Sequence, residues 1–185
     1  MFNSGLAKFG LIAGLAAFSS VAVAQENPTP SRSVESFQSW TLECNNIKVQ
    51  SEGGEESYRR ICEVIQPYIN QQARSEVARL VFGFDEKEPE KLVGAIRTIV
   101  NVSFESGPSI LEGDTTRFIG KFNRCAGTFC YAIFDINAEG FAEFQASKNS
   151  RLQYALANGS LLTIPVNKAG LADAMKALRS RAASE

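Results

Sequence analysis

Trp40-Thr41-Leu42-Glu43-Cys44 is the stretch that decides the fold, because its apolar and polar side chains alternate. A period of two places Trp40, Leu42 and Cys44 on one face of an extended strand and the two polar residues between them on the other. We therefore predict a half-buried strand here, with the tryptophan side chain as an anchor of the core.

Similar runs continue toward the C-terminus. Alternating or apolar runs of strand length predict strands at residues 78–84, 100–105, 117–122, 129–136, 141–145, 151–157 and 161–166. The last two are joined by Asn158-Gly159-Ser160, and an Asn-Gly step favours a tight β-hairpin turn. Residues 137–140 predict a looser turn, and the charged run at residues 85–91 predicts a solvated loop.

The alternation stops near residue 166, and a helical pattern replaces it. Leu171, Ala174, Met175 and Leu178 fall at i, i+3, i+4 and i+7, which predicts one short amphipathic helix, with Asn167 as its cap. Many short strands followed by a single helix indicate an all-β class. The expected architecture is an antiparallel β-sandwich with one short C-terminal α-helix.

The N-terminus has the pattern of an export signal. Lys8 precedes an apolar run at residues 9–18, and a small-residue site predicts cleavage between Ala24 and Gln25. The apolar run is shorter than the roughly 20 residues that span a bilayer, so we expect no transmembrane segment in the mature chain. The predicted organisation is a signal peptide at residues 1–24, a flexible leader at 25–36 and a β-sandwich domain at 37–181.

Four cysteines behind an export signal indicate disulfide bonds, because exported proteins fold in an oxidising compartment. Three connectivities are open, and the spacing favours Cys44 with Cys62 and Cys125 with Cys130, since each pair brackets a predicted turn. A zinc site or a redox pair would favour Cys-x-x-Cys spacing, which neither pair has. We expect four structural cysteines and no metal.

The composition excludes several kinds of chemistry. The chain contains no histidine, so no Ser-His-Asp or Cys-His catalytic arrangement is available. Removal of Lys8 with the signal leaves 18 basic and 20 acidic residues, a balance without the positive charge that nucleic-acid binding requires. We predict a protein that is not an enzyme, with no catalytic residues, no cofactor and no nucleic-acid partner. A pair of carboxylates remains the one catalytic option.

The chain also resembles a known family, the invasion-associated locus B proteins of Gram-negative bacteria. The motifs that carry the resemblance are Trp40-Thr41-Leu42-Glu43-Cys44, Arg60-Ile61-Cys62-Glu63, Phe122-Asn123-Arg124-Cys125, Gly127, Cys130-Tyr131-Ala132, Ile164-Pro165-Val166-Asn167, Gly170, Ala174 and Leu178. Leu171 departs from the aromatic residue expected after Gly170. The resemblance implies an immunoglobulin-like β-sandwich, a periplasmic, secreted or outer-envelope location, and an association with host-cell entry in pathogens. It implies no catalytic or cofactor residues.

Three functions are compatible with these observations. The first is an exported, non-enzymatic envelope protein that binds an unknown protein or envelope component, with peripheral attachment to the outer membrane left open. The second is a periplasmic carrier of a small apolar ligand, bound among some of the thirteen phenylalanines. The third is a hydrolase of glycans, which requires two carboxylates that face each other across a cleft.

Overall fold

The structure is a computed structural model that describes residues 32–50, 53–54 and 56–182. The predicted signal peptide at residues 1–24 and its cleavage site between Ala24 and Gln25 lie outside the described residues, as do residues 25–31 of the predicted leader. Neither of the two helices in the described part of the chain has the length and hydrophobicity of a membrane span.

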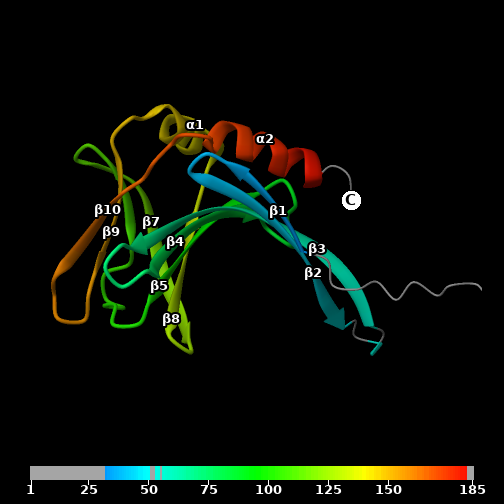
Figure 1. Ribbon diagram of the computed structural model, residues 1–185, viewed down its shortest axis with the longest axis horizontal. Coiled ribbons are helices and arrows are strands. Elements are labelled where there is room, and N and C mark those ends of the chain that lie inside the picture. Colours follow the sequence, from blue (N-terminus) through cyan, green and yellow to red (C-terminus); the bar gives the residue numbers. More distant parts are fainter. Residues whose placement is uncertain (1–31, 51–52, 55, 183–185) are drawn as a thin grey trace, which may run out of the picture.

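The fold consists of ten strands and two helices in the described residues (Figure 1). The strands are β1 (Arg32–Phe37), β2 (Trp40–Gln50), β3 (Glu56–Asn70), β4 (Ser75–Phe84), β5 (Leu92–Ile99), β6 (Ser109–Glu112), β7 (Thr115–Ala126), β8 (Phe129–Asp135), β9 (Ser150–Ala155) and β10 (Leu161–Pro165). The helices are α1 (Ala138–Ala146) and α2 (Leu171–Ala182). The predicted all-β class and the C-terminal helix are confirmed.

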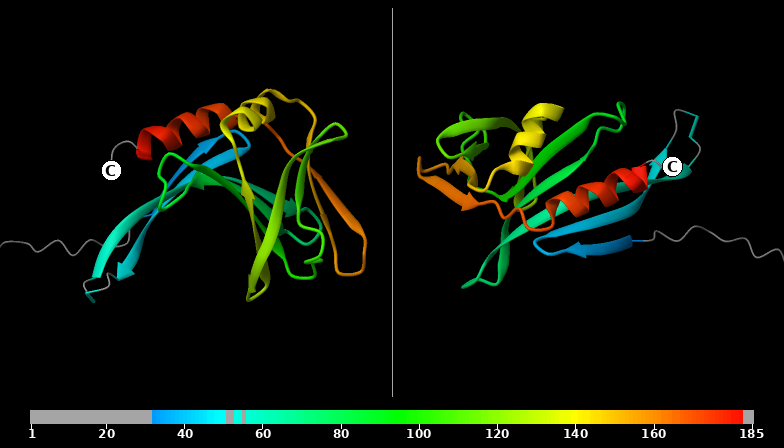
Figure 2. Two further views of the ribbon diagram at one scale, coloured as in Figure 1. Left: turned by 180° about the vertical axis from the view of Figure 1, so that it is seen from behind. Right: turned by 90° about the horizontal axis from the view of Figure 1, so that it is seen from above.

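All ten strands are hydrogen-bonded in one open antiparallel sheet, in the order β1-β2-β3-β4-β5-β8-β7-β6-β9-β10. The long strand β7 joins the two halves, because its first part pairs with β6 and its last part with β8. The two layers of the sandwich are therefore parts of one bent sheet, and both helices lie along the same side of the molecule (Figures 1 and 2). β1 and β10 are the two edges of this sheet.

The core lies between the inward faces of the sheet and the two helices. Trp40 and Phe82 are fully buried, and their ring centroids are 5.6 Å apart. Phe82 also contacts Phe141 and Phe144 of α1, with ring centroids 5.1 and 5.7 Å away. The prediction that Trp40 is a core anchor is confirmed. Helix α2 completes the core with Leu171, Ala174, Met175 and Leu178, the predicted apolar stripe.

Residues 141–145, predicted as a strand, instead belong to helix α1. Asn137, predicted to be part of a turn, caps this helix, since its Oδ1 accepts a hydrogen bond from the Gly140 amide at 2.6 Å. Phe141 and Phe144 are both buried and three residues apart, a helical spacing. The strand prediction was wrong because a short aromatic run fits either period until its cap is recognised.

Residues 100–105 were also predicted as a strand, but they follow strand β5, which ends at Ile99. Asn101 has a φ of +85°, a conformation that a regular strand does not adopt. Val102 makes only an isolated bridge with Leu156, and Phe104 is 52% exposed. The segment is therefore a loop at the edge of the core, although its apolar and polar residues alternate as they do in a strand.

The predicted flexible leader at residues 25–36 is corrected at its end. Residues 32–36 are not a leader but part of strand β1, which pairs with β2 from Arg32 opposite Asn45 to Phe37 opposite Trp40. Only Phe37 among its residues packs against the core, so the strand has little apolar signal in the sequence. Its backbone pairing with β2 explains why a polar segment adopts this structure.

The β10–α2 connection is tied to the sheet by a buried polar network that the sequence did not predict. The Gln66 side chain is 3% exposed and donates from Nε2 to the Asn167 carbonyl at 2.6 Å, while its Oε1 accepts from the Asn167 amide at 3.1 Å. Trp40 Nε1 donates to the same carbonyl at 2.8 Å, and the Tyr68 hydroxyl donates to Gln66 Oε1 at 2.8 Å. These bonds fix the position from which α2 starts.

Asn167 was predicted as the helix cap, but its Oδ1 accepts from the Ala169 amide at 2.9 Å and so shapes the turn before the helix. Gly170 lies directly before α2, and its carbonyl accepts from the Ala174 amide at 3.0 Å. Gly170 has a φ of +87°, and a Cβ there would lie 2.0 Å from the Phe37 carbonyl oxygen. Glycine is thus required at this position, directly before the first helical residue.

Candidate interaction surface

Both disulfides link residues that lie directly opposite each other on neighbouring strands. Cys44 of β2 is bonded to Cys62 of β3, with Cα atoms 4.0 Å apart, and Cys44 is 1% exposed. Cys125 of β7 is bonded to Cys130 of β8, with Cα atoms 3.9 Å apart. This is the pairing that the spacing favoured, and each bond closes a hairpin.

The four cysteines do not form one site. The first disulfide joins β2 to β3 and the second joins β7 to β8, with β4 and β5 between these hairpins in the sheet. No group of three or more potential metal ligands occurs among residues 32–50, 53–54 and 56–182. The first disulfide lies at the base of a projecting hairpin, and the second lies beside the tight turn at Gly127, where Cys125 is exposed.

The hairpin above the first disulfide extends beyond the neighbouring strands. Among the described residues, which begin at Arg32, β1 pairs with β2 as far as Asn45, and β4 pairs with β3 from Val64. Residues 47–50 and 56–59, which we call the arm, pair with each other and, within the described residues, with no further strand. Figure 1 shows this hairpin projecting from the body of the sheet. Isolated two-stranded hairpins are marginally stable, so a disulfide at the base stabilises the arm.

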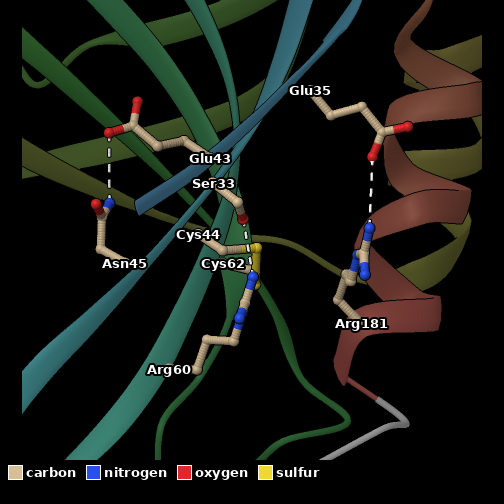
Figure 3. The surroundings of a disulfide bond; sticks show 8 residues. All are labelled: Ser33, Glu35, Glu43, Cys44, Asn45, Arg60, Cys62 and Arg181. Carbon is tan, nitrogen blue, oxygen red and sulfur yellow. Dashed lines mark hydrogen bonds and ion pairs between the residues drawn. A yellow bond between two sulfur atoms is a disulfide. The ribbon is translucent and has the colours of Figure 1, made fainter. Parts of the chain in front are cut away.

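Polar contacts hold the base of the arm to β1 and the β4–β5 loop, and α2 in turn contacts β1. Arg60 of β3 donates to Ser33 Oγ of β1 at 2.8 Å, and Arg181 of α2 lies 3.7 Å from Glu35 of β1 (Figure 3). Arg59 pairs with Glu86 of the β4–β5 loop at 2.6 Å. Each exposed ion pair contributes at most about 1 kcal/mol, so these contacts orient the arm more than they stabilise it.

Two cavities meet at the C-terminal end of α2. The first encloses about 190 Å³ beside the base of the arm, and Arg59, Cys62 and Leu178 are among its lining residues. The second encloses about 490 Å³ between α1, α2 and the β4–β5 loop. Both are lined by Phe84, Pro89 and Ala182. The second volume falls in the range of small-molecule pockets.

The apolar wall of the larger cavity comes from three elements. Phe84 of β4, Leu92 of β5 and Phe141 of α1 line it together with Ile136. Its charged lining residues are Glu90, Lys91 and Arg179. This arrangement can surround a small apolar group.

One pair of carboxylates lies on neighbouring strands of the outer sheet face. Glu43 of β2 is directly opposite Glu63 of β3. A hydrogen bond from Arg32 lowers the pKa of Glu43, whereas partial desolvation and the Glu43 charge raise the pKa of Glu63, whose side chain is exposed on the sheet surface. Neither residue lines the cavities described above. The pair therefore lacks the cleft that a glycan hydrolase requires.

The fold and the two cross-strand disulfides define an antiparallel β protein with a projecting hairpin, a covering pair of helices and no recognisable catalytic arrangement in the described residues. Residues 40–179 match the family model described as invasion associated locus B (IalB) protein. The match covers more than half of the chain, so the chain belongs to this family. No curated protein matches the chain.

A solved structure supports the fold. The chain is similar to the crystal structure of invasion associated protein b from Bartonella henselae, with a TM-score of 0.60 over 80% of this chain and 95% of that chain. The two sequences are 14% identical, so this likeness concerns the fold alone. Neither the description of the family nor that of this structural relative names an enzyme.

Proposed function

We propose that this chain is an exported cell-envelope protein that acts by binding a protein or surface component through its arm. The observation that carries the proposal is that the arm projects from the sheet while a disulfide and contacts to β1 and the β4–β5 loop hold its base. A projecting, oriented hairpin offers both side chains and strand edges to a partner.

The side chains of the arm suit a mixed interface. Ile47 and Val49 of β2 lie half-buried on one face of the hairpin, and Tyr58 of β3, opposite Lys48, is 42% exposed on the other face. Lys48 and Glu56 form an ion pair at 2.5 Å beside Tyr58. Tyrosine and aliphatic residues with charged neighbours are typical of protein-binding surfaces, which combine an apolar centre with a polar rim.

Export is part of the proposal. The three-part pattern of residues 1–24, with predicted cleavage between Ala24 and Gln25, supports it. The two disulfides also support a periplasmic, secreted or outer-envelope location, because such bonds form in oxidising compartments. Cell fractionation with intact-mass analysis tests this point. A product that still contains residues 1–24, or that carries four free thiols, would contradict export.

Site-specific crosslinking on intact cells tests the binding function. A photo-crosslinking residue at Val49 should capture a reproducible partner, whereas the same residue at Ile119, which is 73% exposed on β7 and remote from the arm in the sheet order, should not. The partners to include are envelope proteins and, because of the family name, host-cell surface components. Equal capture from both positions, or capture from neither, would overturn the arm as the binding site.

A second candidate function is the carriage of a small apolar ligand. The cavity of about 490 Å³ with Phe84, Leu92, Ile136 and Phe141 in its lining favours it. Native mass spectrometry of the protein purified from its own cells should then detect a bound small molecule. Replacement of Ala142, another lining residue, with Trp should reduce that bound fraction. A native mass equal to that of the polypeptide alone would exclude this function.

A further inference from the structure

The two edges of the open sheet differ in their chemistry. β1 carries charges that are already paired, since Arg32 contacts Glu43 at 2.8 Å and Glu35 contacts Arg181 at 3.7 Å. β10 has the sequence Leu-Leu-Thr-Ile-Pro and contains no charged residue. Charged side chains on an edge strand normally prevent the addition of another strand, so β10 is the edge that permits it.

The apolar side chains of β10 are incompletely covered. Leu161 is 65% exposed. Leu162 and Ile164 pack against the core but stay partly exposed, because no strand among the described residues lies beyond β10. Figure 1 shows β10 at the outer margin of the molecule, on the far side of β9 from the rest of the sheet. An added strand would extend the core at this edge.

The direction of the backbone groups in β10 follows from two hydrogen bonds at its ends. The Val166 amide donates to the Ser150 carbonyl at 2.9 Å, and the Ser160 carbonyl accepts from the Leu156 amide at 2.8 Å. Successive residues of an antiparallel strand direct their backbone groups to opposite sides. The even-numbered residues of β10 therefore bond to β9, and the odd-numbered residues, Leu161, Thr163 and Pro165, direct their groups away from the sheet.

We propose that β10 pairs in antiparallel fashion with β10 of a second copy of this chain, about a two-fold axis at Leu162. In this register Leu161 lies opposite Thr163 of the second copy. Both residues direct an amide and a carbonyl outward, so each of the two symmetric pairs exchanges two hydrogen bonds, four in total. This inference does not depend on the arm or its partner.

Pro165 selects this register over the alternative. An axis at Thr163 would place Pro165 opposite Leu161 of the second copy, and proline has no amide to donate. With the axis at Leu162, Pro165 lies beyond the paired residues. Leu162 then lies opposite Leu162 of the second copy as a non-hydrogen-bonded pair, with Cβ atoms about 5 Å apart. This contact joins the two cores. The edge is thus complementary to itself in both hydrogen bonding and hydrophobicity.

Amide exchange measured by NMR over a range of protein concentrations tests the pairing directly. In dilute protein, the amides of Leu162 and Ile164 should be protected by β9, while those of Leu161 and Thr163 exchange rapidly. As concentration rises, Leu161 and Thr163 should become protected in parallel with dimer formation measured by sedimentation. Protection of these two amides that does not change with concentration would overturn the proposal.

Two proline variants provide a matched comparison. Thr163→Pro removes one outward amide on β10, and thus two of the four hydrogen bonds of the dimer. Ser36→Pro removes one outward amide from the other edge, β1. Phe37 and Trp40 form the hydrogen-bonded pair that closes the β1–β2 hairpin, so Ser36, the residue before Phe37, directs its amide outward. Thr163→Pro should weaken dimerisation roughly tenfold or more, and Ser36→Pro should leave it unchanged.

A third variant, Leu161→Lys, places a charge on the exposed edge without touching the backbone and should also shift the protein toward monomer. It keeps the test valid if Thr163→Pro fails to fold. A wild-type protein that is monomeric at every concentration, or a dimer that is lost with Ser36→Pro and kept with Leu161→Lys, would refute pairing through β10.

Discussion

Replacement of Gln66 with methionine should destabilise the protein by roughly 2–4 kcal/mol, because it removes three short hydrogen bonds of about 0.5–1.5 kcal/mol each and a longer fourth one from a residue that is 3% exposed. The short bonds are the donation from Gln66 Nε2 to the Asn167 carbonyl and the two that Oε1 accepts, from the Asn167 amide and the Tyr68 hydroxyl. The fourth runs from Nε2 to the Ser39 carbonyl at 3.5 Å. The Asn167 carbonyl keeps its bond from Trp40 Nε1, but the Asn167 amide loses its partner. Methionine preserves the volume, so cavity formation contributes little.

Urea unfolding measures this effect. For a slope of about 1–3 kcal/mol per M, the midpoint should fall by roughly 1 M or more at an unchanged slope. Gln153→Met is the matched control, because Gln153 donates to Thr163 Oγ1 at 3.0 Å on the exposed face. Its cost should stay below about 0.5 kcal/mol. A Gln66→Met midpoint equal to that of the control would refute the role assigned to the network.

Three further predictions concern the disulfide, the helix and pH. The Cys44→Ser, Cys62→Ser double variant should lose about 3 kcal/mol, the value for closure of an 18-residue loop, and a melting curve equal to that of the wild type would show that the bond does not stabilise the arm. Leu178→Asp should undock α2, since Leu178 is 1% exposed, and hydrogen exchange of the helix would stay slow only if this placement is wrong. Burial lowers the pKa of Lys168 to about 8, so the unfolded chain binds more protons between pH 8 and 10 and stability should rise with pH there. Lys168→Met should abolish that rise, and a rise that persists in the variant would assign it to another group.

The disulfide pairing shows how much local sequence can determine. Cys44 and Cys62, like Cys125 and Cys130, flank turn-forming residues, so the hairpin that brings each pair together is encoded nearby in the chain. The Asn158-Gly159 turn between β9 and β10 has the same local origin, since Gly159 has a φ of +83° and Asn158 Oδ1 accepts from the Ser160 amide at 3.0 Å. Turn chemistry depends on a few consecutive residues, and a single sequence contains it.

The candidate surface was only partly predictable, because its contacts join residues that are far apart in the sequence. Arg59 and Arg60 are adjacent in the sequence, but their contacts with Glu86 and Ser33 each join residues 27 positions apart. Among the described residues, the edges of the arm follow from where β1 and β4 stop pairing, and the alternation of residues does not contain that information. Gln66 gave no signal at all, because a glutamine on a strand is ordinarily solvent-exposed.

The sequence by itself determined the all-β class, the inward face of Trp40, the two disulfides and the apolar stripe of α2, because period and turn chemistry act over a few residues. Only the tertiary structure decided that β10 rather than β1 presents an uncharged edge, and that Gln66 bonds to Asn167, 101 residues away. These features depend on which distant segments exclude water from one another, and burial of that kind exists only once the chain has folded.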